Sequence, residues 1–212
     1  MSSVDAGFDR VAPFYDPLAR LVFGDALRRA QQAALAGLPP GRPRVLIIGG
    51  GSGWVLGEVL QRRPDARVLY LEASALMLAK SRATLLQAAP EHAGQVEFRL
   101  GTEHDLRPDE SFDAIITFFF LDLFEPRRLQ AILDALNQAR RPGAPWLLAD
   151  FRPAQTLWQR LLLQTMYRFF RLTTGISGRA MPDLHPALRC LGLVVQQQHV
   201  FFRGLVEATV FG

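Results

Sequence analysis

A glycine-rich turn between a buried strand and a helix is the feature that most constrains the fold of this chain. The run Arg44 to Ile48 (RVLII) is continuous, apolar and rich in β-branched residues, which is typical of a strand buried on both faces of a parallel sheet. Gly49-Gly50-Gly51-Ser52-Gly53 follows at once, and Trp54 to Arg62 then has the pattern of a helix. Glycines let the backbone approach a ligand without an intervening Cβ, and the N–H groups at a helix start favour a negative group. The sequence therefore predicts an anion-binding strand–turn–helix unit.

The spacing of these glycines distinguishes two kinds of nucleotide-binding turn. A dinucleotide fingerprint has the spacing G-x-G-x-x-G, but counting from Gly49 and Gly51 places Trp54 at the third glycine position. An indole there would block the close packing of helix and strand that a pyrophosphate turn needs. The spacing G-x-G-x-G is met by Gly49, Gly51 and Gly53. A tight turn that binds no ligand is the other interpretation.

Strands and helices alternate along most of the chain. Apolar residues at helical spacing predict a first helical segment from about Pro17 to Ala36, closed by Gly37 and Pro39-Pro40. Further predicted strands are Arg67–Leu71, Val96–Leu100, Phe112–Phe118 and Trp146–Asp150, and further predicted helices are Ser74–Ala88 and Arg127–Arg140. Such alternation implies a parallel sheet with helices on both faces.

The end of the chain has a different pattern. Leu193 to Val200 and Leu205 to Phe211 are strand-like runs separated by a short turn containing Gly204, so the last strand is predicted to be antiparallel. The 212 residues, 49% of them hydrophobic, fit a single domain. Within it, residues 1–40 are expected to form an N-terminal helical cap. Residues 151–190 form the irregular segment between the fifth strand and the hairpin.

Composition excludes several classes of protein. The 24 basic and 20 acidic residues are scattered, so no nucleic-acid binding is predicted, while anionic partners and a membrane surface stay compatible. Cys190 is the only cysteine and the four histidines lack metal-ligand spacing, which predicts neither a disulfide nor a metal site. The first sixteen residues lack a basic region followed by an apolar stretch, so a cytoplasmic location is expected.

A carboxylate at the end of the second predicted strand points to an adenosyl ligand. Glu72 lies where an acidic side chain can accept hydrogen bonds from both hydroxyls of a ribose. Nicotinamide dinucleotides and S-adenosylmethionine (SAM) both use this arrangement, so Glu72 does not choose between them. A solvated charge at a strand end is the other interpretation.

Six motifs, taken in order, resemble one family. FDRVAPFYD, VLIIGGGSG, YLEAS, GTEHDL, SFDAIIT and RPGAPWLLADF resemble the class I SAM-dependent methyltransferases. The likeness is greatest to the branch that contains ubiquinone and menaquinone C-methyltransferases and bacterial phospholipid N-methyltransferases, and it covers nearly the whole chain. It implies an α/β, Rossmann-like sheet of seven strands in the order 3-2-1-4-5-7-6, with strand 7 antiparallel and helices on both faces. It also implies SAM as cofactor and S-adenosylhomocysteine (SAH) as product.

The resemblance also implies a set of cofactor-binding residues from five parts of the chain. These are Tyr15 in the N-terminal segment, Gly49, Gly50, Gly51, Ser52 and Gly53 around the amino acid moiety, Glu72 and Ala73 at the ribose, Gly101, Thr102 and Glu103 by the adenine, and Phe118 after the fourth strand. Two positions depart from the family pattern. Ile47 replaces an acidic residue two positions before the first glycine, and Thr102 replaces an aspartate at the adenine edge. A weaker affinity for SAM or an altered pose is therefore an expectation.

Candidate catalytic residues follow the fourth and fifth strands. Methyl transfer needs a base only if the acceptor must lose a proton first. Asp122 and Asp150 are candidate bases because the carboxyl ends of the strands face the ligand in such sheets. Both are also typical of structural caps or solvated charges. His104, in the adenine loop, is a further candidate, whereas His185 and His199 are expected to be surface or strand residues.

The segment Thr156 to Leu172 has apolar and aromatic residues at roughly helical spacing, interrupted by arginines, and is not a good membrane span. In the family that the chain resembles, the stretch after the fifth strand commonly shapes the acceptor pocket, so residues 151–190 are expected to be an acceptor-pocket insertion. If the segment lines this pocket, the acceptor is a small apolar or aromatic molecule. It could equally pack on the core, or lie on a bilayer as a peripheral contact. The first function expected is methyl transfer to oxygen, nitrogen or carbon. The alternatives are a SAM-binding regulatory or scaffold protein, suggested by Ile47, and a nicotinamide-dependent oxidoreductase, suggested by the glycine turn and Glu72.

Overall fold

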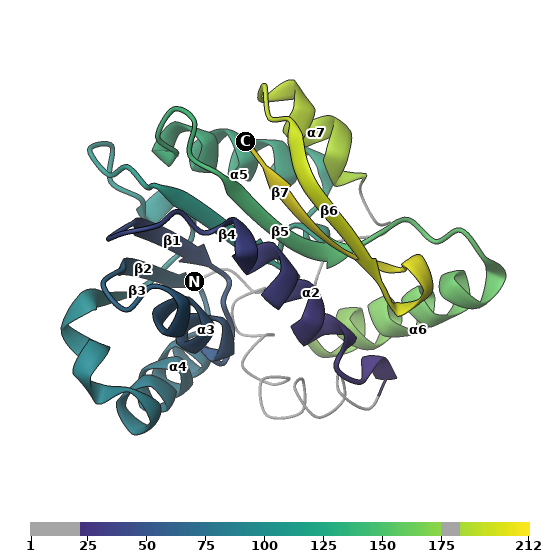
Figure 1. Ribbon diagram of the computed structural model, residues 1–212. Coiled ribbons are helices and arrows are strands. Elements are labelled where there is room, and N and C mark those ends of the chain that lie inside the picture. The colour runs from purple at the N-terminus through teal and green to yellow at the C-terminus, as the bar shows by residue number, and fades with distance from the viewer. Residues whose placement is uncertain (1–21, 175–182) are drawn as a thin grey trace.

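A seven-stranded sheet forms the centre of the molecule (Figure 1), which a computed structural model describes for residues 22–174 and 183–212. The strands lie in the order β3-β2-β1-β4-β5-β7-β6. Strands β1 to β5 are parallel, and β7 is antiparallel to both β5 and β6. The sheet order and the reversed last strand confirm the sequence prediction. The strands are β1 (Arg44–Ile48), β2 (Arg67–Glu72), β3 (Val96–Leu100), β4 (Ala114–Phe118), β5 (Trp146–Phe151), β6 (Val195–Phe201) and β7 (Val206–Phe211).

Helices cover both faces of the sheet, as predicted. One apolar cluster joins α2, α3, α4 and α6 to one face, and a second cluster joins α5 and α7 to the other. The helices are α2 (Ala26–Ala34), α3 (Trp54–Arg62), α4 (Ala75–Ala88), α5 (Pro126–Ala139), α6 (Leu157–Thr174) and α7 (Leu184–Cys190). Short 3-10 turns are η1 (Leu35–Gly37), η2 (Pro90–Gln95), η3 (Glu103–Asp105), η4 (Leu121–Leu123) and η5 (Phe202–Gly204).

Three predicted elements differ from the structure. The described part of the first helical segment is interrupted at Gly24, which has a φ of 57°, and α2 begins only at Ala26. The fourth strand begins two residues later than predicted, because Phe112 forms only an isolated bridge with Arg140. The segment expected to be irregular contains two helices, α6 and α7. The second of these begins after Asp183, whose side chain accepts a hydrogen bond from the backbone N–H of His185.

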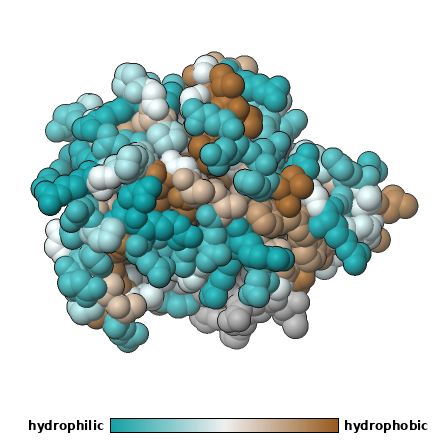
Figure 2. Space-filling model, viewed as in Figure 1, coloured by the Kyte–Doolittle hydropathy of each residue, from teal (hydrophilic) through white to brown (hydrophobic). Residues whose placement is uncertain are grey.

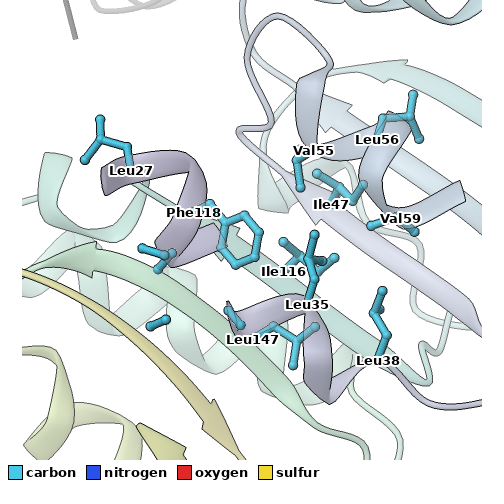
Figure 3. Close-up of a cluster of buried hydrophobic side chains, with 14 of the residues drawn as sticks. Leu27, Leu35, Leu38, Ile47, Val55, Leu56, Val59, Ile116, Phe118 and Leu147 are labelled. Atoms are coloured by element: carbon cyan, nitrogen blue, oxygen red, sulfur yellow. The ribbon is translucent and has the colours of Figure 1, made fainter. Parts of the chain in front are cut away.

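The core beside β1 explains why Ile47 is not acidic. Its side chain is 1% exposed and lies among apolar side chains of the first cluster, including Val55 of α3 and Ile116 of β4 (Figure 3). A carboxylate at this position would lose its hydration without an ion-pair partner in this cluster, which is strongly unfavourable. The family's acidic position has therefore become part of the hydrophobic core.

A buried ion pair joins β1 and β3 to the segment that precedes β4. Glu110 accepts hydrogen bonds from both terminal nitrogens of Arg99, at 2.8 Å each, from the backbone N–H of Arg107, and from Arg44 at 3.2 Å. The hydrogen bonds from Arg99 are the main reason that the pKa of Glu110 is lowered from 4.5 to about 2. The carboxylate thus holds β1 and β3 to the segment that precedes β4.

Because the folded state lowers this pKa, the stabilisation by Glu110 is fully present above pH 4.5 and is lost as the pH falls towards 2. We expect the Glu110→Gln variant to be less stable than the natural chain by about 3 kcal/mol at neutral pH. The difference should shrink as the pH falls through this range. Urea unfolding of both proteins over a pH series measures it, and a difference that stays constant with pH would contradict the assignment.

Candidate active site

The glycine turn lies at the carboxyl end of β1 and leads directly into α3. Gly49, Gly51 and Gly53 have φ angles of 66°, 62° and 93°, in the left-handed region that residues with a Cβ rarely adopt. Gly53 is the N-cap of α3 and provides no side-chain cap. The N-terminus of α3 carries a partial positive charge and faces the turn. Its N-cap residue has no acidic side chain that would neutralise this charge.

Protein packing requires three of the four glycines. A Cβ on Gly49 would collide with the ring of Phe120, one on Gly50 would lie 2.6 Å from the Tyr70 ring, and one on Gly53 would lie 2.8 Å from the Cα of Ser81. Gly51 differs, because no atom of the described residues lies within 4 Å of the position of its Cβ. Close packing within the protein therefore does not require glycine at position 51. Its left-handed φ of 62° does, and the open space beside it leaves room for a ligand.

Glu72 connects the glycine turn to the next two loops. Its Oε2 accepts a hydrogen bond from the Gly51 N–H at 3.1 Å, and its Oε1 accepts one from the Ser74 N–H at 3.0 Å. Its backbone carbonyl accepts the N–H of Gly101 at 3.0 Å. The side chain is 9% exposed. Each carboxylate oxygen can accept more than one hydrogen bond, so both can still accept from ribose hydroxyls.

Tyr70 holds the turn from β2, in a role that the sequence did not reveal. It pairs in register with Ile47, and its hydroxyl donates a hydrogen bond to the Gly51 carbonyl at 2.9 Å. Together with Glu72, it fixes both the N–H and the carbonyl of Gly51. Two side chains of β2, Tyr70 and Glu72, thus position the turn. The position on β1 where the family pattern has an acid is Ile47 in this chain.

The loop after β3 contains the predicted adenine residues. The Thr102 side chain and Asp105 form a capping box around η3, in which the Thr102 N–H donates to Asp105 at 2.8 Å. The Glu103 side chain is 2% exposed and forms an ion pair with Arg128 of α5, while the Nε2 of His104 lies 3.1 Å from its Oε1. Both predicted side chains of this loop are therefore engaged by other groups of the protein. Ala73 is half-buried beside Glu72, and Tyr15 lies outside the described residues.

Aromatic residues occupy the carboxyl end of β4. Phe118 ends the strand and packs in the first apolar cluster near α2 (Figure 3). Phe119 has a φ of 50°, an uncommon conformation for a bulky residue that is often associated with functional sites. The ring of Phe120 packs directly against Gly49. This turn therefore places one ring, that of Phe120, directly against the glycine turn, while the ring of Phe119 packs against Phe151.

The two candidate bases are both buried. Asp122 lies in η4 and is 3% exposed, while Asp150 near the end of β5 is 0% exposed. The Oδ1 of Asp150 accepts the Phe151 N–H at 2.8 Å. Burial raises the pKa of Asp150 well above its ordinary value of 3.8, and the negative charges of Asp122 and Glu207 raise it further. The raised pKa means that the folded state favours the protonated form more than the unfolded chain does, and no part of the side chain is exposed.

The histidines are placed in different surroundings. The Nε2 of His185 lies 2.8 Å from Glu207, which pairs in register with Asp150, so His185 contributes to a buried polar cluster that the sequence did not predict. His199 is exposed on β6, and His104 is exposed beside Glu103. Within residues 22–174 and 183–212, no three acidic, histidine or cysteine side chains gather as metal ligands.

Asp150→Asn is expected to be at least as stable as the natural chain, with an advantage that grows with pH. The raised pKa means that the folded state favours the protonated acid, so the natural chain loses stability as the pH rises above the ordinary value. Asparagine keeps the acceptor for the Phe151 N–H and has no charge to bury. Urea unfolding over a pH series that starts near 4 tests this, and an equal loss of stability at every pH would refute it.

A hollow of about 500 Å³ lies elsewhere, at the amino ends of the strands. Prolines make up half of its lining residues, and Arg42, Asp113 and Arg141 also line it. Ligands of open α/β sheets bind at the carboxyl ends. The glycine turn, Glu72 and the rings after β4 are therefore the candidate site, and the hollow is not part of it.

Comparisons with known proteins agree with this site. A family model described as a methyltransferase domain matches residues 46–145, from β1 to the start of β5. The ubiquinone/menaquinone biosynthesis C-methyltransferase UbiE of Syntrophotalea carbinolica is 28% identical over 230 residues, which cover 96% of this chain and 89% of that protein.

Solved structures share the fold. The mitomycin 7-O-methyltransferase MmcR aligns over 96% of this chain, with a TM-score of 0.66 and 23% identity. The O-methyltransferase NcsB1 from neocarzinostatin biosynthesis, in complex with SAM and 2-hydroxy-5-methyl naphthoic acid, aligns over 79%, with a TM-score of 0.59 and 18% identity. This chain spans 60% and 48% of the lengths of those two chains.

The fold, the glycine turn and the sequence matches identify the chain as a class I SAM-dependent methyltransferase, with SAM as its cofactor. Among characterised enzymes it is similar to the UbiE C-methyltransferases. These matches support neither a nicotinamide-dependent oxidoreductase nor a scaffold protein.

Proposed function

We propose that this methyltransferase acts on a small, largely apolar or aromatic acceptor. The observation that carries the proposal is a row of aromatic rings that begins at the end of β4. The ring centroid of Phe119 lies 5.3 Å from that of Phe151. The centroid of Phe151 in turn lies 5.2 Å from that of Phe23. Phe23 lies 5.0 Å from Phe202, and Phe202 lies 6.1 Å from Trp158 of α6. An apolar acceptor would be held by such surfaces.

In this proposal the cofactor binds at the glycine turn. The start of α3 would hold the methionyl carboxylate, Glu72 would accept the ribose hydroxyls, and the backbone of Gly101 to Glu103 would contact the adenine. Once bound, SAM supplies a methyl group already activated by its sulfonium. The task of the protein is then to position the acceptor in line and to exclude water.

Trp158 supports the expectation that residues 151–190 contribute to the acceptor pocket, since it lies at one end of the aromatic row. The naphthoic acid bound in the NcsB1 structure belongs to the same chemical class. Asp122 and Asp150 are buried, so in this proposal they do not remove a proton from the acceptor.

Gly51→Ala tests the cofactor site. The space beside Gly51 admits a Cβ, so the stability loss should be only the ~1–2 kcal/mol of a left-handed alanine. Binding of SAH, measured by calorimetry, should weaken by about tenfold or more, since the new methyl group meets the ligand.

Gly143→Ala is the matched control, because Gly143 has a φ of 76° and equally open surroundings but lies before β5, away from the turn. It should show a similar stability loss and unchanged affinity for SAH. Equal affinity in the two variants would exclude close approach of the cofactor at Gly51.

The acceptor class is tested with SAM and a panel of naphthols, hydroxynaphthoic acids and quinols, with mass spectrometry of the products. Methylated aromatic product is the expected result. Trp158→Ala should raise the KM for the aromatic acceptor while SAH affinity stays the same. Methylation of peptide or nucleic acid alone would overturn the proposed acceptor class.

A further inference from the structure

Charge is unevenly distributed along this chain. Residues 151–182 contain five arginines and no acidic residue, so this segment carries more than the whole net charge of +4. The helix α6 makes up more than half of the segment. A basic helix without acidic residues is typical of contact with an anionic surface.

The outward face of α6 is apolar in its first two turns. Leu157 is 76% exposed, Leu161 is 65% exposed and Trp158 is 38% exposed. Gln159 and Leu163 lie on the opposite, buried side of the same helix. The leucines at positions i and i+4 point to the same side, because residues four apart lie on one helix face. Figure 2 shows hydrophobic atoms projecting at the right-hand edge of the molecule, over the start of α6.

Cations surround this apolar patch. Arg160 and Arg168 are exposed on α6, and the guanidinium of Arg203 lies 5.9 Å from the ring of Trp158. Tryptophan, leucine and arginine on one face form the pattern of a helix that lies in a membrane interface, with arginines at the headgroups and apolar side chains below them. No described helix is long and apolar enough to cross a bilayer.

We propose that the outward face of α6, centred on Leu157 and Leu161, binds the surface of anionic membranes. A second copy of the chain fits this face poorly. A stable dimer buries about 800 Å² on each partner, and two such faces would bring arginines together. A nucleic acid would match the arginines and not the protruding leucines. An anionic lipid surface matches both.

The test uses the full chain and sedimentation with vesicles of phosphatidylcholine, alone or mixed with phosphatidylglycerol. Binding is expected only to the mixed vesicles, and added salt should weaken it. The double variant Leu157→Ser/Leu161→Ser should bind at least about tenfold more weakly, because it removes the apolar contact. Arg160→Gln/Arg168→Gln should lose about fivefold per arginine on the anionic vesicles.

Leu76→Ser/Leu86→Ser is the matched control, because these leucines of α4 are 46% and 51% exposed and lie away from α6. It should bind as the natural chain does, and every variant should keep its affinity for SAH, which shows that the fold is intact. The proposal is overturned if the natural chain does not bind mixed vesicles, or if the control loses as much binding as the α6 variant. It is also overturned if light scattering shows a dimer that the α6 leucine variant alone dissociates.

Discussion

Gly53→Ala is expected to destabilise the fold by about 2–5 kcal/mol, the largest stability effect of a single methyl group near this site. Two penalties combine. At a φ of 93° an alanine is strained, and its Cβ would lie 2.8 Å from the Cα and 2.9 Å from the Cβ of Ser81. Since the Cα belongs to the backbone of α4, relief requires α3 and α4 to move apart. Urea unfolding measures the loss.

Gly57→Ala, four residues further on in α3, should have the opposite sign. Gly57 lies within the helix, and no atom of the described residues lies within 4 Å of its Cβ position. The substitution should stabilise the protein by about 0.5–1 kcal/mol. If both alanines changed stability alike, contact with Ser81 would not be the reason for glycine at position 53.

Glu72→Gln is expected to weaken SAH binding by about 100-fold. Each carboxylate oxygen accepts a backbone N–H, from Gly51 and from Ser74, so the amide nitrogen of glutamine must face one of these donors. The unsatisfied N–H destabilises the turn by about 1–3 kcal/mol, and the charge that would bind the ribose hydroxyls is lost as well. Calorimetry with SAH measures the change.

Glu110→Gln separates these effects, because it also removes a buried carboxylate that accepts backbone and side-chain hydrogen bonds. It should lower stability and leave SAH affinity within about twofold of the natural value. An equal loss of affinity in the two variants would mean that general destabilisation, and not the position of Glu72, controls binding.

The sheet was predictable because its signals are local. Buried runs such as Arg44–Ile48 are continuous and β-branched, and the short loop at Gly204 requires the last strand to reverse. The described helix α7 was missed because its seven residues include Pro186 and too few positions for a period to show. Its signal was Asp183, an N-cap residue placed before Leu184.

The candidate site was predictable only in part. The glycines and Glu72 follow strands directly, so their positions could be read from spacing. The contacts of Tyr70 with Gly51 and of His185 with Glu207 join residues distant in sequence, and they depend on sheet register. For the same reason the burial of Asp150 could not be foreseen, since strand β7 covers it only after the antiparallel pairing has formed.

The aromatic row and the glycine turn differ in how the chain assembles them. The turn is completed by neighbouring segments, since Gly51, Tyr70, Glu72 and Gly101 all precede β4. The row joins Phe23 to Phe202 and takes its other rings from between them, so it exists only when nearly the whole chain is in place. If this row binds the acceptor, as proposed, acceptor preference can change one ring at a time without any change in the residues that form the glycine turn. A fragment ending after β3 would keep these parts of the turn and lack most of the row.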